Sequence, residues 1–177
     1  MLTTTAQAAS RPAPERAAVV GRKRRPSARD LHTLHAEILS SADIERVFAF
    51  FSDPFNLEAI TPPWLRFGIL TPAPVVMREG LVLDYRLRVR GIPMRWQSII
   101  MAWEPPLRFI DAQSVGPYAW WWHEHRFEPV VGGGTRITDT VEYAAPGGRL
   151  LHDVLVRPDL ERIFAYRAVR LRELLGA

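Results

Sequence analysis

Two histidines and one aspartate are the side chains in this sequence whose spacing best suits them to do chemistry. His123 and His125 lie two positions apart in an aromatic-rich segment, residues 118–130, and Asp139 follows the three glycines at 132–134. Alternate residues of a β-strand point to the same face, so both imidazoles would project from one side of a sheet. A carboxylate beside an imidazole fixes its tautomer and favours its protonated form. Such a pair is a candidate general acid or base.

The polar residues around these glycines indicate which faces of the two segments point inward. Those expected to face water are Glu124, Arg126 and Glu128 before the glycines, and Arg136, Thr138, Thr140 and Glu142 after them. The alternate positions then face the interior, and they are Trp121, His123, His125 and Phe127 in the first strand and Ile137, Asp139, Val141 and Tyr143 in the second. The sequence therefore predicts a hairpin with a polar cluster on its buried face.

The register of this hairpin decides which histidine meets the carboxylate. A turn around Gly132 places His125 opposite Asp139, whereas a shift of two residues places His123 there instead. In either register the side-chain roots lie about 4.5–5.5 Å apart. Three interpretations remain open: a network that only satisfies polar groups, a site that orients a ligand, and acid–base catalysis by His123, His125 and Asp139.

A metal site is a further possibility, because His-x-His on a strand aligns two imidazoles and Asp139 could add an oxygen. The chain has no cysteine and no other clearly inward histidine. We therefore expect no metal site and no other cofactor. The sequence also carries no nucleophile motif or phosphate-binding loop, so binding is favoured over catalysis.

Apolar periodicity predicts the elements that position these residues. Residues 31–40 are a strand candidate, and Ser40 or Ser41 can cap a helix that follows. The apolar face of that helix consists of Ile44, Val47, Phe48 and Phe51. Asp53-Pro54 indicates the start of a second short helix.

Strand patterns then dominate, and the C-terminal segment is helical. Leu83, Tyr85, Leu87 and Val89 alternate with charged residues, which is the period of a half-buried antiparallel strand. One helical face near the C-terminus carries Leu160, Ile163, Phe164, Leu171, Leu174 and Leu175. Pro158 should start this helix or kink it. The element order predicts an α+β fold with its helices on one face of an antiparallel sheet.

The net charge of +4 belongs to the N-terminus. Residues 1–30 hold seven basic and two acidic residues, and residues 31–177 hold 16 basic and 17 acidic ones. We predict a disordered basic tail over residues 1–30, a single domain over residues 31–177 and no nucleic-acid partner. No apolar run approaches the ~18 residues that span a bilayer, and no signal-peptide apolar core is present. A cytoplasmic location without stable membrane insertion is expected, and the oligomeric state is left open.

Three consecutive tryptophans precede the histidines. In the predicted phase Trp121 points inward, while Trp120 and Trp122 point outward. Two exposed indoles would form an apolar surface patch of the kind that binds partners. We expect them instead to pack under the N-terminal segment or a neighbouring chain, although an interaction module working through the tail and these rings is an alternative.

Several short motifs point to a known family. They are Asn56-Leu57-x-x-Ile60-Thr61-Pro62-Pro63, Trp103-Glu104-Pro105-Pro106-x-Arg108-Phe109, Gly116-Pro117-Tyr118, Trp121-x-His123-x-His125-x-Phe127 and Asp159-Leu160-x-x-Ile163-Phe164-x-Tyr166-Arg167. With the element order, they resemble the START-like helix-grip fold of the SRPBCC superfamily, which includes birch-pollen-allergen-like, lipid-transfer and polyketide cyclase proteins. The resemblance covers about residues 31–176. It is sharper for a bacterial ligand-binding SRPBCC subgroup that is similar to polyketide cyclases and dehydrases.

The resemblance implies a curved antiparallel sheet of about seven strands around a long C-terminal helix, with two short helices after the first strand. Its cavity would bind a hydrophobic or aromatic small molecule, such as a lipid, a polyketide or an isoprenoid-like compound. A cyclase or dehydratase that uses the His–Asp pair is the alternative. The match at Phe109 suggests that Asp111 and Gln113 also face inward. The expected binding residues are Trp64, Tyr85, Trp96, Phe109, Asp111, Gln113, Trp121, His123, His125, Asp139 and Tyr143.

Overall fold

One antiparallel sheet forms the body of the protein, of which the computed structural model describes residues 19–176. The strands are β1 (Val19–Val20), β2 (Lys23–Arg24), β3 (His32–Ser40), β4 (Gly68–Ile69), β5 (Val82–Val89), β6 (Ile92–Glu104), β7 (Arg108–Val115), β8 (Trp120–Pro129) and β9 (Thr135–Ala144). The helices are α1 (Ile44–Ser52), α2 (Gly148–Leu151) and α3 (Arg157–Leu175), with short turns η1 (Ala28–Asp30), η2 (Pro54–Glu58), η3 (Pro63–Leu65) and η4 (His152–Val156). The seven-stranded sheet has the order β3-β9-β8-β7-β6-β5-β4.

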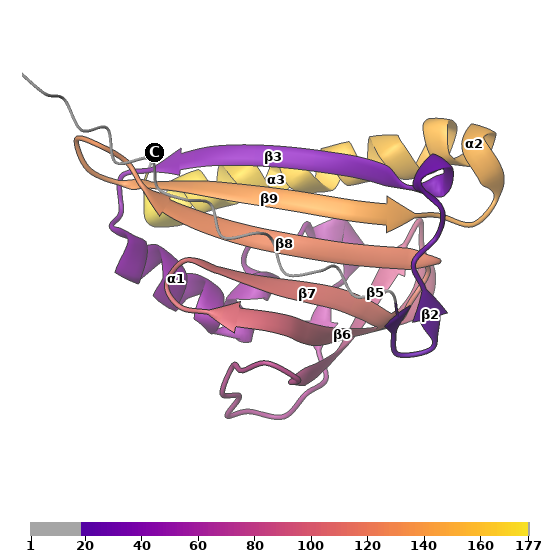
Figure 1. Cartoon of the computed structure of the whole chain (residues 1–177), viewed down its shortest axis with the longest axis horizontal. Coiled ribbons are helices and arrows are strands. Elements are labelled where there is room, and N and C mark those ends of the chain that lie inside the picture. The colour runs from indigo at the N-terminus through magenta and orange to yellow at the C-terminus, as the bar shows by residue number, and fades with distance from the viewer. Residues whose placement is uncertain (1–18, 177) are drawn as a thin grey trace, which may run out of the picture.

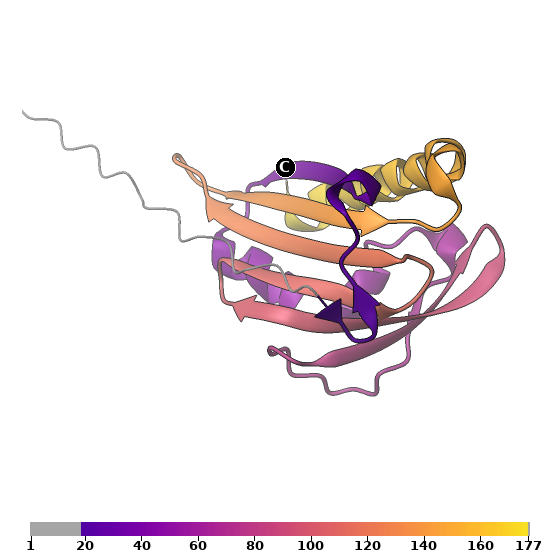
Figure 2. The same ribbon diagram turned by 45° about the vertical axis from the view of Figure 1, so that its right-hand side comes forward.

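The long helix α3 lies along one face of this sheet, behind β3 and β9 in Figure 1. Leu160 and Phe164 of α3 pack with Val141 of β9. Nearer the C-terminus, Leu171 joins a core cluster with Ile38 of β3. Helix α1 lies on the same side of the sheet as α3 (Figure 2). This arrangement confirms the predicted antiparallel sheet with its helices on one face.

Helix α1 begins at a different cap from the one predicted. Asp43 is the N-cap residue, and its carboxylate accepts a hydrogen bond of 2.7 Å from the backbone N–H of Arg46. The predicted cap at Ser40 or Ser41 is wrong. Ser40 instead donates its hydroxyl to the carbonyl oxygen of Leu175 at 2.9 Å. This bond ties the end of β3 to the end of α3.

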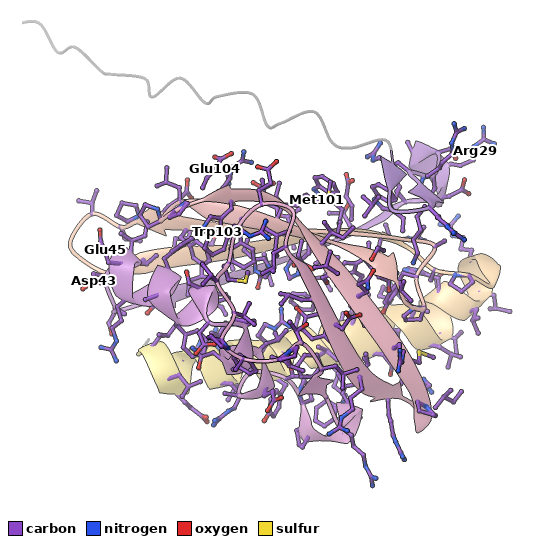
Figure 3. The ribbon with its side chains drawn as sticks, turned by 90° about the horizontal axis from the view of Figure 1, so that it is seen from below. Arg29, Asp43, Glu45, Met101, Trp103 and Glu104 are labelled. Atoms are coloured by element: carbon purple, nitrogen blue, oxygen red, sulfur yellow. The ribbon has the colours of Figure 1, made fainter. Side chains whose placement is uncertain are left out.

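A bulge in β6 brings Trp103 to the inner face of the sheet. The register between β6 and β7 shifts after Ile100. Met101 therefore packs with the outer apolar cluster, whereas the ring of Trp103 lies 5.1 Å from that of Phe48 on α1. Figure 3 shows Trp103 near α1 and Arg29 at the opposite end of the molecule. The bulge thus helps α1 to seat against the sheet.

The C-terminal helical segment runs from Gly148 to Leu175 and widens just before Pro158. The turn η4, which follows Leu151, has π-helical geometry, and α3 then starts at Arg157 with Pro158 in its first turn. Proline has no N–H to donate to the preceding turn. Leu151, Val156 and Arg157 keep right-handed helical backbone angles, so the segment continues through the π-helical turn as one helix. The predicted start of a new helix at Pro158 is therefore not found, and the missing donor falls beside a local widening instead.

The N-terminal segment is ordered against the body from Val19 onward. Strands β1 and β2 form a small antiparallel hairpin, and Val20 is only 2% exposed. The prediction of a disordered tail reaching residue 30 is therefore wrong for residues 19–30, because this segment has an apolar surface to cover. The rest of that prediction, on residues 1–18, lies outside the described residues.

Two basic residues of this segment, Lys23 and Arg25, bond to the body of the protein. The Lys23 ammonium donates a hydrogen bond to the carbonyl oxygen of Tyr118. Arg25 Nη2 lies 3.1 Å from Glu142 Oε2. Glu142 was expected to face water, yet its side chain is 9% exposed, because the N-terminal segment covers this part of β9.

The N-terminal hairpin covers the outward tryptophans. Trp120 is 1% exposed and Trp122 is 5% exposed, and their rings stack in parallel at a centroid distance of 6.2 Å. Val20 belongs to the same outer cluster as both indoles. Of the two expectations for these rings, packing under the N-terminal segment is the one that the structure bears out.

Replacing Val20 with aspartate should lower the free energy of unfolding by about 2–3 kcal/mol, because the change removes buried apolar area and places a carboxylate against two indoles. Urea denaturation followed by tryptophan fluorescence measures the loss. The exposed Arg22→Asp variant is the matched control and should change stability by less than about 0.5 kcal/mol. Equal stability of the two variants would contradict the packing of this hairpin.

Among the described residues, no helix is both long enough and apolar enough to cross a membrane.

Candidate functional site

A cavity of about 810 Å³ lies between the inner face of the sheet and α3. Pockets that hold small molecules usually measure about 300–1,000 Å³. Aromatic rings supply much of the wall, and they are Phe50, Phe51, Trp64, Phe67, Tyr85, Trp96, Phe109, Tyr118, Trp121 and Phe164. The cavity is therefore of ligand size, and its wall favours apolar or aromatic compounds.

A cluster of ionisable side chains lies on the sheet side of the wall, where β7, β8 and β9 run side by side. The register of β8 with β9 places His125 opposite Asp139, which confirms the predicted turn around Gly132. The register of β7 with β8 places Asp111 opposite His123. All four side chains project from the inner face, so two imidazoles and two carboxylates lie next to one another there.

The hydrogen bonds run along the diagonals between strands, not between residues directly opposite. His123 Nε2 lies 3.1 Å from Asp139 Oδ1, and His125 Nε2 lies 3.1 Å from Asp111 Oδ2. His125 Nδ1 lies 2.8 Å from Asp139 Oδ1, but this contact lacks hydrogen-bond alignment. His123 Nδ1 lies 3.6 Å from Asp111 Oδ2. Each imidazole thus spans both carboxylates.

Burial and the charges of neighbouring groups shift the pKa values of this cluster in opposite directions. Burial alone would lower the pKa of His125, but Asp139 and Asp111 outweigh it, and the pKa of His125 is raised. Burial and the neighbouring His125 lower the pKa of His123. Burial would raise the pKa of both carboxyl groups, yet the imidazoles hold the pKa of Asp111 low and that of Asp139 well below its usual range. The cluster therefore carries a net negative charge at neutral pH.

Asp111 links the polar cluster to the aromatic wall. Its carboxylate also accepts a hydrogen bond of 3.2 Å from the Ser98 hydroxyl, which in turn accepts one of 3.0 Å from Trp96 Nε1. The Asp111 side chain is 18% exposed, whereas that of Asp139 is 2% exposed. Asp111 therefore faces the cavity, and Asp139 lies behind the imidazoles.

Most of the predicted binding residues line the cavity. Those on its wall are Trp64, Tyr85, Trp96, Phe109, Asp111, Trp121, His123 and His125. Their contact with a ligand remains a prediction, and so does any catalytic role of His123, His125 or Asp139.

Three predicted binding residues are placed elsewhere. Gln113 faces inward but is 1% exposed, and its Nε2 donates to the carbonyl oxygen of Tyr118 at 2.9 Å. Asp139 is covered by the histidines. The hydroxyl of Tyr143 lies 2.9 Å from His152 Nε2. The correction has one physical reason: each polar group bonds to a neighbouring protein group instead of opening into the cavity.

Several polar residues of the cavity lining were not predicted, and Arg167 is the one among them with an unpaired buried nitrogen. Arg167 of α3 lines the cavity, and its Nε is buried without a hydrogen-bond partner among residues 19–176. Its guanidinium lies 5.0 Å from the centre of the Phe164 ring. The sequence did contain a signal, because position 167 falls three residues after Phe164 and seven after Leu160, on the apolar face of the helix.

A sheet curved around a long C-terminal helix, enclosing an aromatic cavity, is the helix-grip fold. Solved structures of this fold are similar to the chain at low sequence identity. Protein CV1439 from Chromobacterium violaceum is 15% identical, with a TM-score of 0.65 over 82% of this chain and 97% of that one. Major latex-like protein 151 from Panax ginseng is 12% identical, with a TM-score of 0.62 over 84% and 99% of the two chains.

Protein Ms6760 from Mycobacterium smegmatis is 20% identical, with a TM-score of 0.60 over 81% of this chain and 90% of that one. No family model matches the sequence, and no curated protein matches it either. These likenesses establish the fold. The bacterial ligand-binding subgroup suggested by the motifs stays a prediction.

Proposed function

We propose that this chain binds a hydrophobic or aromatic small molecule, of lipid, polyketide or isoprenoid type, between its sheet and α3. The observation that supports this most strongly is the cavity of about 810 Å³, which is walled largely by rings and carries Asp111, His123 and His125 on its sheet side. Burial of apolar ligand surface there would supply most of the binding free energy. His125 and Asp111 would orient a polar group of the ligand.

Arg167 adds a second polar anchor to this proposal. Its guanidinium lies on the opposite wall, on α3, with an unpaired buried Nε. A buried donor without a partner destabilises the empty protein. An anionic or carbonyl group on the ligand would satisfy it, so ligands with an acidic or carbonyl end are favoured over pure hydrocarbons.

The direct test is to identify what the protein carries. The full-length chain is purified, denatured and extracted with organic solvent, and the extract is examined by mass spectrometry. A stoichiometric apolar or aromatic compound is the expected result. If nothing co-purifies and neither apolar dyes nor fatty acids bind to the folded protein, the proposal fails.

Filling the cavity should block binding. Leu87 lies on the cavity wall and is partly buried. Leu87→Trp should weaken binding of an apolar fluorescent dye by at least about tenfold, equivalent to about 1.4 kcal/mol. Val82→Trp places the same ring on the outer face of β5, where Val82 is 40% exposed, and should leave dye affinity unchanged. Equal affinity of the two variants would show that the dye binds elsewhere.

The cyclase or dehydratase alternative is favoured by one observation. Two imidazoles on the cavity wall are each backed by carboxylates at hydrogen-bond distance, an arrangement that suits proton transfer. Under this alternative, His123→Ala and His125→Ala should abolish turnover of a polyketide-like substrate while the substrate still binds. Unchanged turnover in both variants would exclude it.

The expectations of a cytoplasmic location and of no nucleic-acid partner remain predictions.

A further inference from the structure

We propose that Asp111, His123 and His125 form a binding site for one divalent transition-metal ion in the wall of the cavity. One ligand atom from each residue lies within 4.8 Å of those of the other two. The sequence suggests a metal site only through Asp139, and from it we expect none. The fold instead adds the carboxylate of Asp111, which comes from a different strand.

The distances between the ligand atoms fit a shared ion. Metal bonds to imidazole nitrogen and carboxylate oxygen measure about 2.0–2.2 Å. Two such ligands at angles between octahedral and tetrahedral therefore lie about 3.0–3.5 Å apart. Asp111 Oδ2 lies 3.1 Å from His125 Nε2 and 3.6 Å from His123 Nδ1. All three ligand atoms lie within 4.8 Å of one another, so rotation of the side chains would have to bring them to these separations around an ion.

Asp139 lies beside the ring nitrogens that this metal site would not use. It lies 3.1 Å from His123 Nε2 and 2.8 Å from His125 Nδ1. An ion would take the place of the proton in the hydrogen bond between His125 Nε2 and Asp111. With His123 Nε2 and His125 Nδ1 protonated beside Asp139, the opposite nitrogens, His123 Nδ1 and His125 Nε2, would offer their lone pairs to the ion. Histidine ligands usually donate their second N–H to a carboxylate or carbonyl in this way. Asp139 is thus a positioning residue in this proposal.

The charge of the cluster also favours a cation. Two carboxylates lie within a largely apolar part of the molecule, and in the described part of the chain their ion-pairing partners are the two histidines alone. Buried negative charge without full compensation is costly. A divalent ion would neutralise two carboxylates in the presence of two neutral imidazoles.

Two histidines and one carboxylate occupy three positions of an ion and leave the others open. Such an open set is typical of zinc sites that bind water or substrate and of non-haem Fe²⁺ sites. Asp111, His123 and His125 all line the cavity, whereas Asp139 does not. An oxygen atom of a bound ligand could therefore occupy an open position. This last step rests on the proposed ligand-binding function, but binding of the ion itself does not.

The test is an isothermal calorimetric titration of the chelator-treated full-length protein with Zn²⁺. One Zn²⁺ per chain is expected. Asp111→Asn, His123→Ala and His125→Ala should each abolish this binding, and Asp139→Asn should weaken it by about 10–100-fold. His35→Ala removes an exposed histidine on β3 and is the matched control, for which binding should be unchanged.

Titration with Co²⁺ gives a second readout, because its visible absorption bands report nitrogen and oxygen coordination. The bands should appear with the wild-type chain and be lost in Asp111→Asn, whose fold is checked by circular dichroism. Absence of stoichiometric binding in the wild type, or equal binding in Asp111→Asn, would overturn the proposal. Dye binding to the chelator-treated protein is measured in parallel, so that failure of the metal site and failure of the ligand cavity are told apart.

Discussion

Replacing Asp139 with alanine should lower the free energy of unfolding by about 3–5 kcal/mol, because the change removes the shared partner of two buried imidazoles. Asp139 is 2% exposed and lies within 3.1 Å of a nitrogen of each histidine. The imidazoles hold the pKa of Asp139 well below its usual range, so the folded state favours the ionised carboxylate. Without it, His125 would have only Asp111 to stabilise its charge.

Denaturation in urea with a chelator present measures this effect free of any bound metal. Asp111→Ala is the matched comparison and should lower the free energy of unfolding by less than Asp139→Ala does. The Asp111 side chain is 18% exposed, so water can replace part of its hydrogen bonding. If Asp139→Ala loses less than about 1 kcal/mol, Asp139 is not the buried counter-charge that the structure indicates.

Replacing Phe127 with alanine should also lower the free energy of unfolding by about 3–5 kcal/mol. Phe127 is 0% exposed, and its ring lies 5.0 Å from that of Phe51 and 5.6 Å from that of Phe48. Both partners belong to α1, so the cavity left by the truncation would lie under the helix that closes one end of the sheet. The surrounding rings cannot collapse into that space without moving α1.

Thermal unfolding followed by circular dichroism checks this expectation. Phe55→Ala is the control, since Phe55 is 36% exposed, and it should lower the free energy of unfolding by less than about 1 kcal/mol. Phe127 does not line the ligand cavity. Dye affinity of the folded Phe127→Ala protein well below its melting temperature should therefore change little. A large loss of affinity without a loss of stability would contradict the role assigned to Phe127.

Local patterns were sufficient to predict the hairpin at the centre of the site. Alternation of charged and apolar residues set the phase of β8 and β9, and the glycines at 132–134 set the turn. The observed pairing of His125 with Asp139 follows from those two facts. Such predictions succeed because the side-chain period of a strand and the residues of a tight turn are properties of a few neighbouring positions.

The hydrogen bonds within the cluster were beyond the reach of that reasoning. Residues directly opposite were expected to interact, yet the bonds run diagonally, from His123 to Asp139 and from His125 to Asp111. Strand register places side-chain roots, whereas rotamers and neighbours from a third strand choose the partner. Gln113 shows the same limit. Its inward phase did not reveal that its amide would donate a hydrogen bond to the carbonyl oxygen of Tyr118.

The sequence by itself determined the class of fold, the apolar faces of β5, β8 and β9 and the register that brings an imidazole to a carboxylate. Those features depend on periodicity and turn residues, which are local. Only the tertiary structure decided that residues 19–30 cover Trp120 and Trp122, that Asp111 completes the histidine cluster and that Arg167 reaches the cavity. Each of these depends on which distant segments come into contact, and that is settled by the packing of the whole chain rather than by any stretch of it.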